Sequence, residues 1–321
     1  MEKEILIFGH KNPDTDSICS AMVKERLNKK NGHDSSVAVR LGNINKETQY
    51  VLNYLNLEAP ELKEEVAEGQ KVIMVDHNEF NQSIKGIEKA KILGVVDHHR
   101  IANFETSDPL YYTARPYGCT STILFQDFKG KGIEINREEA ILMASAIISD
   151  TLLLKSPTTT KHDEKALEEL EKIAGIDIKE YGLEMLKAGT DLDDFTAKEL
   201  INLDAKELDK NGIKFVIGQV NTVDIPSVLE RQEELEKAIE EELKEKELAL
   251  FVLAITDILN SNSEILVLGE KSSVVEKAFD KKLENNRAFL EGVVSRKKQL
   301  LPNIDKNINS YIFIDRWFFY V

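Results

Sequence analysis

Short aliphatic runs that alternate with amphipathic segments constrain the fold of the first half of the chain more than any other feature. Such runs of Ile, Leu and Val lie within residues 4–10, 35–42, 71–79 and 91–99. The segments between them, such as 20–30, carry apolar residues at helical spacing. Continuous apolar runs separated by helical segments are typical of a buried parallel sheet with helices on both faces. The pattern therefore predicts an α/β domain with a mostly parallel sheet.

The second half predicts a smaller α/β domain with a mixed sheet. Its apolar runs lie at 213–220, 248–257 and 263–269. A long helix is expected to begin with Pro226 at its first position, where a missing backbone N–H is tolerated. Residues 188–195 are rich in Gly, Thr and Asp and interrupt the pattern. We therefore expect a first domain over 1–187, a hinge linker over 188–195 and a second, smaller domain over 196–321.

The charge balance limits the partners of the protein. The 42 Lys and Arg residues against 57 Asp and Glu residues give a formal charge of −15. A field of this sign repels polyanions, so nucleic acid is not expected as a partner. No apolar stretch approaches the roughly 20 residues of a membrane span, and the first residues do not resemble a signal peptide. We therefore expect a cytoplasmic protein without a membrane partner, in which Cys19 and Cys119 are small buried residues.

Metal-ligating side chains follow the apolar runs at the points where the predicted strands end. They are His10, Asp76, and the triplet Asp97, His98 and His99. Asp14 and Asp16 follow shortly after the first run, and Asp150 ends an apolar helix predicted over 138–151. The carboxyl ends of parallel strands meet at one edge of a sheet, so these residues are expected to share one crevice. Taken alone, the turn at 12–16 would equally suit a helix entry in which an aspartate caps the next helix.

The ligand types indicate a pair of divalent ions. Imidazole and several carboxylates without thiolate suit Mn²⁺, Co²⁺, Mg²⁺ or Zn²⁺. Four or five carboxylates can neutralise two such ions, and a bridging carboxylate would hold them about 3.5–4 Å apart. At that spacing a water between the ions loses a proton near neutral pH and can attack phosphorus. The residues therefore favour phosphoryl hydrolysis.

A cationic motif, SRKKQ at 295–299, follows the apolar FLEGVV. Three consecutive cations are most often part of a solvated surface. In an acidic protein with a two-metal site, however, Arg296 and Lys297 at a strand end would suit a multiply charged phosphate, since Arg binds as a fork and Lys as a point charge. The second domain would then close over the crevice as a lid.

The same motifs resemble a known family. GHKNPDTD, VDHNE, VVDHHR and the ISDT that ends a helix are similar, in this order, to the four blocks of the DHH phosphoesterase superfamily. Together with SRKKQ they resemble the manganese-dependent (family II) inorganic pyrophosphatases, over residues 1 to 302. The resemblance implies hydrolysis of pyrophosphate by a metal-bridging hydroxide, with two Mn²⁺ or Co²⁺ ions per subunit and Mg²⁺ brought in with the substrate. It also implies a homodimer formed through the N-terminal domain.

The resemblance further implies a role for each site residue. One metal would be held by His10 and Asp14, the other by Asp16, His98 and Asp150, and Asp76 would bridge them. Asp97 would fix the orientation of a neighbouring histidine, and His99 would face the substrate. The phosphate-binding cations would be Lys206, Arg296 and Lys297. Lys206 is expected in a helix-to-strand connector, and Lys298 on the surface.

Two alternatives and one departure from the family pattern remain open. Another DHH phosphodiesterase or exopolyphosphatase would act on short oligonucleotides, cyclic dinucleotides or polyphosphate, but the GGGH-type motif of the nucleotide-cleaving relatives is absent. A metal-dependent phosphate or nucleotide sensor would keep the site without turnover. The tail at 303–321, which contains Trp317, extends beyond the family pattern and is expected to add a strand to the second domain or to contact a second subunit.

Overall fold

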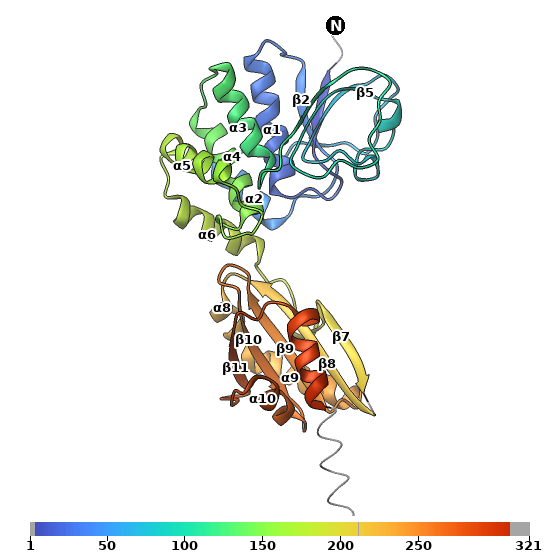
Figure 1. Cartoon of the computed structure of the whole chain (residues 1–321), viewed down its shortest axis with the longest axis vertical. Helices are drawn as coiled ribbons and strands as arrows, with labels where there is room; N and C mark the ends of the chain where they lie inside the picture. The colour runs from blue at the N-terminus through green and yellow to red at the C-terminus, as the bar shows by residue number, and fades with distance from the viewer. Residues whose placement is uncertain (1–3, 211, 309–321) are drawn as a thin grey trace, which may run out of the picture. The chain divides into compact units, whose positions relative to one another are not determined.

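The computed structural model describes residues 4–210 and 212–308. These residues form two compact units, and the boundary between the units falls after Gly189 (Figure 1). Each unit contains one sheet. The roles of 188–195 as a hinge and of 196–321 as a lid stay predictions.

The sheet of the first unit is parallel throughout, as the alternation of apolar runs and helical segments predicts. Its six strands have the order β3-β2-β1-β4-β5-β6. Their bounds are β1 Ile5–Phe8, β2 Ser36–Arg40, β3 Glu61–Leu62, β4 Lys71–Val75, β5 Lys91–Asp97 and β6 Tyr111–Ala114. The central strands β1, β4 and β5 carry the predicted site residues at their carboxyl ends, so the topology brings these residues to one edge.

The α-helices of this unit lie in two layers against one face of the sheet. They are α1 Thr15–Lys30, α2 Lys46–Leu55, α3 Thr120–Lys131, α4 Arg137–Thr151, α5 Lys161–Ala174 and α6 Ile178–Gly189. Helices α1 and α3 contact the strands, and α4 packs on α1, α3 and α5 (Figure 1). Every residue of 140–148 in α4 is buried, which is typical of a helix that is apolar on all sides.

The other face of this sheet is covered mainly by short connecting segments. Two single 3₁₀ turns, η1 Phe80–Gln82 and η2 Ile87–Lys89, belong to these segments. Leu6 and Phe8, which alternate with Ile5 and Ile7 along β1, pack with Ile84 and Ile87 on this face. The two faces of the predicted domain are therefore covered by different kinds of structure.

The second unit has a mixed sheet, as predicted, in the order β11-β10-β9-β8-β7. Its strands are β7 Ala205–Lys210, β8 Ile213–Thr222, β9 Leu250–Asp257, β10 Asn262–Leu268 and β11 Arg287–Glu291, of which only β8 and β9 pair in parallel. Its helices are α7 Ala197–Asn202, α8 Ile225–Leu229, α9 Gln232–Glu245 and α10 Ser272–Phe279. Leu200 and Ile239 belong to a core cluster on one face, and Val274 and Leu300 belong to a cluster on the other.

The predicted long helix from Pro226 is wrong in its length and its first residue. Asp224 caps α8 by accepting a hydrogen bond from the Ser227 N–H, so Ile225 precedes Pro226 in the first turn. The helix ends at Leu229, and α9 is separate. At the break, the Arg231 guanidinium donates hydrogen bonds to the carbonyls of Leu192 and Phe195.

Three placements in the second unit also differ from the prediction. Lys206 lies on β7, paired with Ile217 of β8, and not in a connector. Arg296 does not stand at a strand end, because four residues separate it from the end of β11; it begins a π-helical turn, η3 Arg296–Leu300, which the Ser295 side chain caps. The described part of the tail, to residue 308, is helical and buries Ile304 and Ile308, so this part adds no strand. Trp317 and its aromatic neighbours lie outside the described residues.

Among the described residues, no helix combines the length and the apolar character that crossing a membrane requires.

Candidate metal centre

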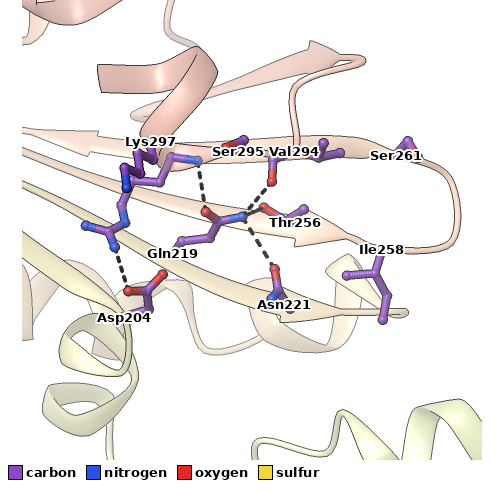
Figure 2. Close-up of a pocket in the computed structure, with 10 residues that line it drawn as sticks. Asp204, Gln219, Asn221, Thr256, Ile258, Ser261, Val294, Ser295 and Lys297 are labelled. Carbon is purple, nitrogen blue, oxygen red and sulfur yellow. Dashed lines mark hydrogen bonds and ion pairs between the residues drawn. The ribbon is translucent and has the colours of Figure 1, made fainter. Parts of the chain in front are cut away.

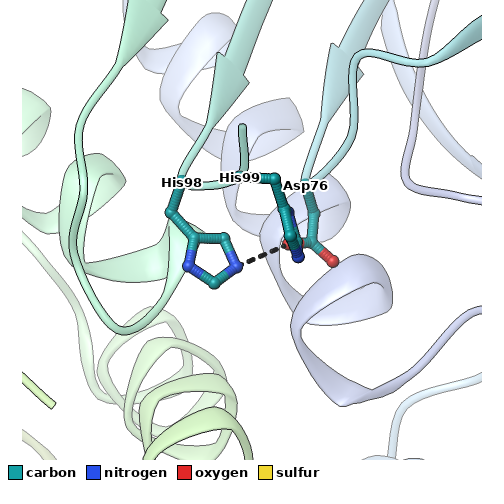
Figure 3. Close-up of side chains that lie close together, drawn as sticks. All are labelled: Asp76, His98 and His99. Carbon is teal, nitrogen blue, oxygen red and sulfur yellow. Dashed lines mark ion pairs between the residues drawn. The ribbon is translucent and has the colours of Figure 1, made fainter. Parts of the chain in front are cut away.

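The structure brings the predicted ligands of the first unit together in three overlapping groups. Within each group, one ligand atom from every member lies within 4.8 Å of the others. The groups are His10, Asp14 and Asp76; Asp16, Asp76, His98 and Asp150; and Asp76, His98 and His99. Figure 3 shows the last of these at the ends of β4 and β5. Asp76 belongs to all three groups.

The turn between β1 and α1 places His10 beside Asp14. Asp14 caps α1, because its Oδ1 accepts a hydrogen bond of 2.9 Å from the Ser17 N–H, and its Oδ2 stands 3.4 Å from His10 Nε2. The turn passes so close to the helix that a Cβ at Gly9 would lie 2.4 Å from Ser17 Oγ. One carboxylate thus serves as the helix cap and still presents an oxygen to the site.

Asp76 stands at the centre of the site. Its side chain is about 1% exposed, and its backbone has a φ of 59°, a strained value for a residue with a Cβ. The hydroxyls of Ser17 and Thr120 donate to Oδ2 and Oδ1 at 2.9 and 3.2 Å. His10 Nε2 lies 3.5 Å from Oδ2, and His98 Nε2 lies 3.4 Å from Oδ1. The two oxygens of Asp76 therefore face different histidines.

The second ligand group is held by contacts to backbone groups. Asp16 accepts hydrogen bonds from the N–H groups of Thr120 and Ser121 at the start of α3, where the helix dipole favours an anion. His98 Nδ1 lies 3.0 Å from the Tyr117 carbonyl oxygen, to which it donates its proton. This leaves Nε2 as the free lone pair, 3.7 Å from Asp150 Oδ2.

The charges of the site fit divalent cations. Burial and the neighbouring aspartates raise the pKa of Asp76 and of Asp150 well above the usual range. Burial opposes the charged form of His10, but the hydrogen bond and charge of Asp14 and the charge of Asp76 raise its pKa overall. Four carboxylates in this small volume repel one another without cations. Their formal charge equals and opposes that of two divalent ions, and the oxygen and imidazole donors suit Mn²⁺.

Asp97 and His99 form a pair beside this cluster. Asp97 is fully buried, and its Oδ1 lies 3.0 Å from His99 Nδ1 while Oδ2 accepts a hydrogen bond of 2.6 Å from Asn78 Nδ2. Burial would raise the pKa of Asp97, yet these hydrogen bonds lower it. The hydrogen bond that the His99 ring donates to Asp97 raises the pKa of His99, whose side chain is 52% exposed. Asp97 thus orients His99, which can still reach a bound ligand.

Sequence reasoning missed the groups that hold these ligands. Ser17, Thr120 and Asn78 were not singled out, although each donates to a site carboxylate. Asn78 lies two residues after Asp76 in the quoted motif VDHNE, which could have drawn attention to it. No local pattern marks Thr120, which is distant in sequence from the residues it contacts.

Two of the predicted phosphate-binding cations, Arg296 and Lys297, line a pocket of about 430 Å³ in the second unit (Figure 2). The pocket is lined by Asp204, Gln219, Asn221, Thr256, Ile258, Ser261, Val294, Ser295, Arg296 and Lys297. Gln219 fixes the cationic turn, because its Oε1 accepts from the Arg296 N–H and its Nε2 donates to the Val294 carbonyl. The Arg296 guanidinium pairs with Asp204 at 2.6 Å. Lys206 is exposed on β7 and is not among the lining residues.

Two protein-family models match the chain. Residues 4–147 match the DHH family N-terminal domain, and residues 183–307 match the DHHA2 domain. The manganese-dependent inorganic pyrophosphatase of Bacillus subtilis (strain 168) is 57% identical over 303 residues, which cover 94% of this chain and 97% of that protein. A probable manganese-dependent inorganic pyrophosphatase of Staphylococcus carnosus (strain TM300) is 58% identical over 298 residues, which cover 93% of this chain and 97% of that protein.

A solved structure agrees with these relatives. The crystal structure of a candidate family II inorganic pyrophosphatase from Methanococcus jannaschii matches with a TM-score of 0.59 and 42% sequence identity. The match covers 95% of this chain and 99% of the other. The chain therefore belongs to the DHH family and, within it, to the manganese-dependent (family II) inorganic pyrophosphatases.

Proposed function

We propose that the protein hydrolyses inorganic pyrophosphate to two phosphates at a two-manganese site in its first unit. His10 and Asp14 would hold one ion, and Asp16, His98 and Asp150 would hold the other. The observation that carries the proposal is the position of Asp76, whose two oxygens face the two ligand groups and which would bridge the ions. When bound, the ion pair lowers the pKa of a shared water, so that hydroxide forms near neutral pH.

The protein's own groups would prepare the substrate for attack. His99 would hydrogen-bond a phosphate oxygen or the leaving group, with Asp97 holding its ring. Arg296, Lys297 and Lys206 would neutralise the charge that develops on the phosphate oxygens, while Mg²⁺ enters with the substrate. The placement of Arg296 and Lys297 in one pocket supports this role, and Lys206 rests on the family resemblance alone.

The assay that tests this function measures phosphate release by the protein loaded with Mn²⁺ or, in parallel, Co²⁺. Pyrophosphate with Mg²⁺ is compared with polyphosphate, a short oligonucleotide and a cyclic dinucleotide. Turnover of pyrophosphate far above that of the other three supports the proposal. Preference for polyphosphate or a nucleotide would instead assign the site to another DHH phosphoesterase, and binding without turnover would indicate a sensor.

We also propose that the protein is cytoplasmic and forms a homodimer through its first unit. The edge strand β6 of that unit supports the second point, since it leaves a row of backbone groups available for pairing and Tyr111 on it is 88% exposed. Light scattering after size exclusion would measure the mass. A monomeric mass at the concentration of the activity assay would contradict the dimer.

A further inference from the structure

Glu47 lies beside the candidate metal centre but outside its ligand groups. It is in the first turn of α2, and its half-buried side chain contacts the N-terminal end of α1 and the C-terminal end of α4. Within the described residues, none of the three groups that could hold a metal includes it. Its contacts therefore require an explanation other than direct ligation.

One oxygen of Glu47 joins the two helices that carry ligands. The hydroxyl of Thr15 donates to Oε1 at 2.6 Å, and the hydroxyl of Ser149 donates to the same oxygen at 2.5 Å. Thr15 stands between Asp14 and Asp16 in the chain, and Ser149 immediately precedes Asp150. Through these two hydrogen bonds the Glu47 carboxylate connects Thr15 to Ser149. It therefore links the chain around two predicted ligands to the chain beside a third.

The surroundings leave this carboxylate little freedom. Thr15 is fully buried, and its hydroxyl also lies 3.1 Å from that of Thr48, the residue after Glu47. On the other side, α6 approaches so closely that a Cβ at Gly189 would lie 2.9 Å from both Cβ and Oε2 of Glu47. Burial raises the pKa of Glu47, the two hydroxyls lower it, and the charge of Asp14 raises it. None of these contacts involves a cation, so they do not form an ion pair. They indicate that the Glu47 carboxylate holds Thr15 and Ser149 in position.

We infer that Glu47 is a positioning residue that sets the distance between the α1 ligands, Asp14 and Asp16, and the α4 ligand Asp150. The inference rests on the metal assignment of the proposed function. Metal ligands must be held within about half an ångström of the required geometry, and residues behind the ligands typically change metal affinity 10- to 100-fold when removed. Glu47 acts through Thr15 and Ser149 and does not touch metal or substrate.

The first experiment compares Mn²⁺ binding by the metal-free full-length protein and its variants, by calorimetric titration with Mn²⁺ alone. Glu47→Ala is expected to weaken binding at one or both sites by about 10- to 100-fold. Glu47→Gln keeps an oxygen acceptor in the same place and is expected to bind close to the wild-type value. Gln49→Ala, at an exposed position of the same helix, is the matched control and should leave binding unchanged.

A spectroscopic measurement separates positioning from general damage to the fold. Electron paramagnetic resonance of the Mn²⁺-loaded protein reports the magnetic coupling of neighbouring ions. The coupled signal is expected to change in Glu47→Ala and to be restored in Glu47→Gln, while the far-ultraviolet circular dichroism of both stays that of the wild type. Ser149→Ala is expected to weaken binding less than Glu47→Ala, and the double variant should be no weaker than Glu47→Ala.

The outcomes distinguish this inference from the proposed function. Failure of the wild-type protein to bind two Mn²⁺ ions would overturn the metal assignment itself. Two ions bound by the wild type and an unchanged affinity and spectrum in Glu47→Ala would overturn only the role of Glu47. Equal losses of Mn²⁺ affinity in Glu47→Gln and Glu47→Ala would show that the negative charge of Glu47, and not its hydrogen bonds, affects metal binding. This result would also overturn the inference.

Discussion

Replacing Asp76 by asparagine should have opposite effects on the stability of the metal-free and the metal-loaded protein. The substitution keeps the shape of the side chain and removes one negative charge. Ser17 and Thr120, which donate to Asp76, can each donate or accept, so both can stay paired with an amide. The change therefore isolates the charge of the central carboxylate.

The metal-free protein is expected to be stabilised by Asp76→Asn at pH 8. Burial and the charges of Asp16 and Asp14 raise the pKa of Asp76 above its usual value of 3.8. Between pH 3.8 and the raised pKa of the folded state, the folded state binds more protons than the unfolded state, so over this range Asp76 makes the free energy of unfolding fall as the pH rises. The ligand oxygens of Asp16, Asp76 and Asp150 lie within 4.8 Å of one another, and at that upper limit two charged carboxylates repel by about 3.5 kcal/mol at an effective dielectric constant of about 20.

Removing one such repulsion is expected to raise the free energy of unfolding of the metal-free protein by about 3 kcal/mol. For a unit of this size, this corresponds to an increase of about 6–12 °C in Tm. Near pH 4 the gain should shrink, because Asp76 is then neutral in the folded wild-type protein. With Mn²⁺ at 100 times its Kd, each wild-type site adds about 2.7 kcal/mol, so two sites add about 5 kcal/mol. Asp76→Asn should lose most of this increment, since the bridge serves both sites.

The assay is thermal unfolding followed by circular dichroism, at pH 4 and pH 8, first with chelator and then with Mn²⁺. Asp108→Asn, at an exposed position of the same unit, is the control and should follow the wild type throughout. The order of stability at pH 8 is expected to reverse when Mn²⁺ is added. If Asp76→Asn in chelator is no more stable than the wild type, the proposed charge repulsion is refuted. If Mn²⁺ stabilises Asp76→Asn as much as the wild type, the role of Asp76 as a bridge is refuted.

Further predictions concern the groups around the substrate. Arg296→Ala and Lys297→Ala should each raise KM and lower kcat, by about 10²-fold or more in kcat/KM, with the manganese content unchanged by elemental analysis. Loss of metal in either variant would contradict a purely substrate-binding role, and Lys298→Ala, outside the pocket, is the control. Asp97→Asn should lower the pKa of His99 toward 6.5, because the hydrogen bond that favours the imidazolium is weakened. His99 would then lose its ring proton at a lower pH, which proton NMR of the metal-free protein measures. An unchanged titration of His99 would refute the effect of Asp97 on its pKa.

The sequence predicted the sheet edge well because strand ends obey a strong geometric rule. His10, Asp76 and His98 follow strands that lie side by side, so the order of the strands alone brings these residues together. Asp14 showed that two interpretations of one residue need not compete, since different oxygens of its side chain cap α1 and face His10. Asp150 follows from the helix prediction, because α4 ends beside the same edge.

Tertiary contacts account for what the sequence did not predict. Glu47 and Thr120 reach the site from segments in which no motif was recognised, because an isolated hydroxyl or carboxylate has no typical spacing. The two edge strands of the first unit were also missed, because β3 has only two residues and β6 is largely exposed. Between α8 and α9, Arg231 contacts the carbonyls of Leu192 and Phe195, which are distant in sequence and therefore outside what local helix propensity reports.

The division of the chain at Gly189 has a consequence for how such a protein can change over time. All candidate metal ligands come from residues 10–150, whereas the pocket with Arg296 and Lys297 is built wholly from residues after 200. If this pocket binds phosphate as proposed, mutations in it would alter phosphate binding without changing any candidate metal ligand, and the reverse would also hold. Under the proposed roles, selection would act on the phosphate contacts of the second unit and on metal preference as largely separate traits within a single gene product, with His99 as the one proposed substrate contact that belongs to the first unit.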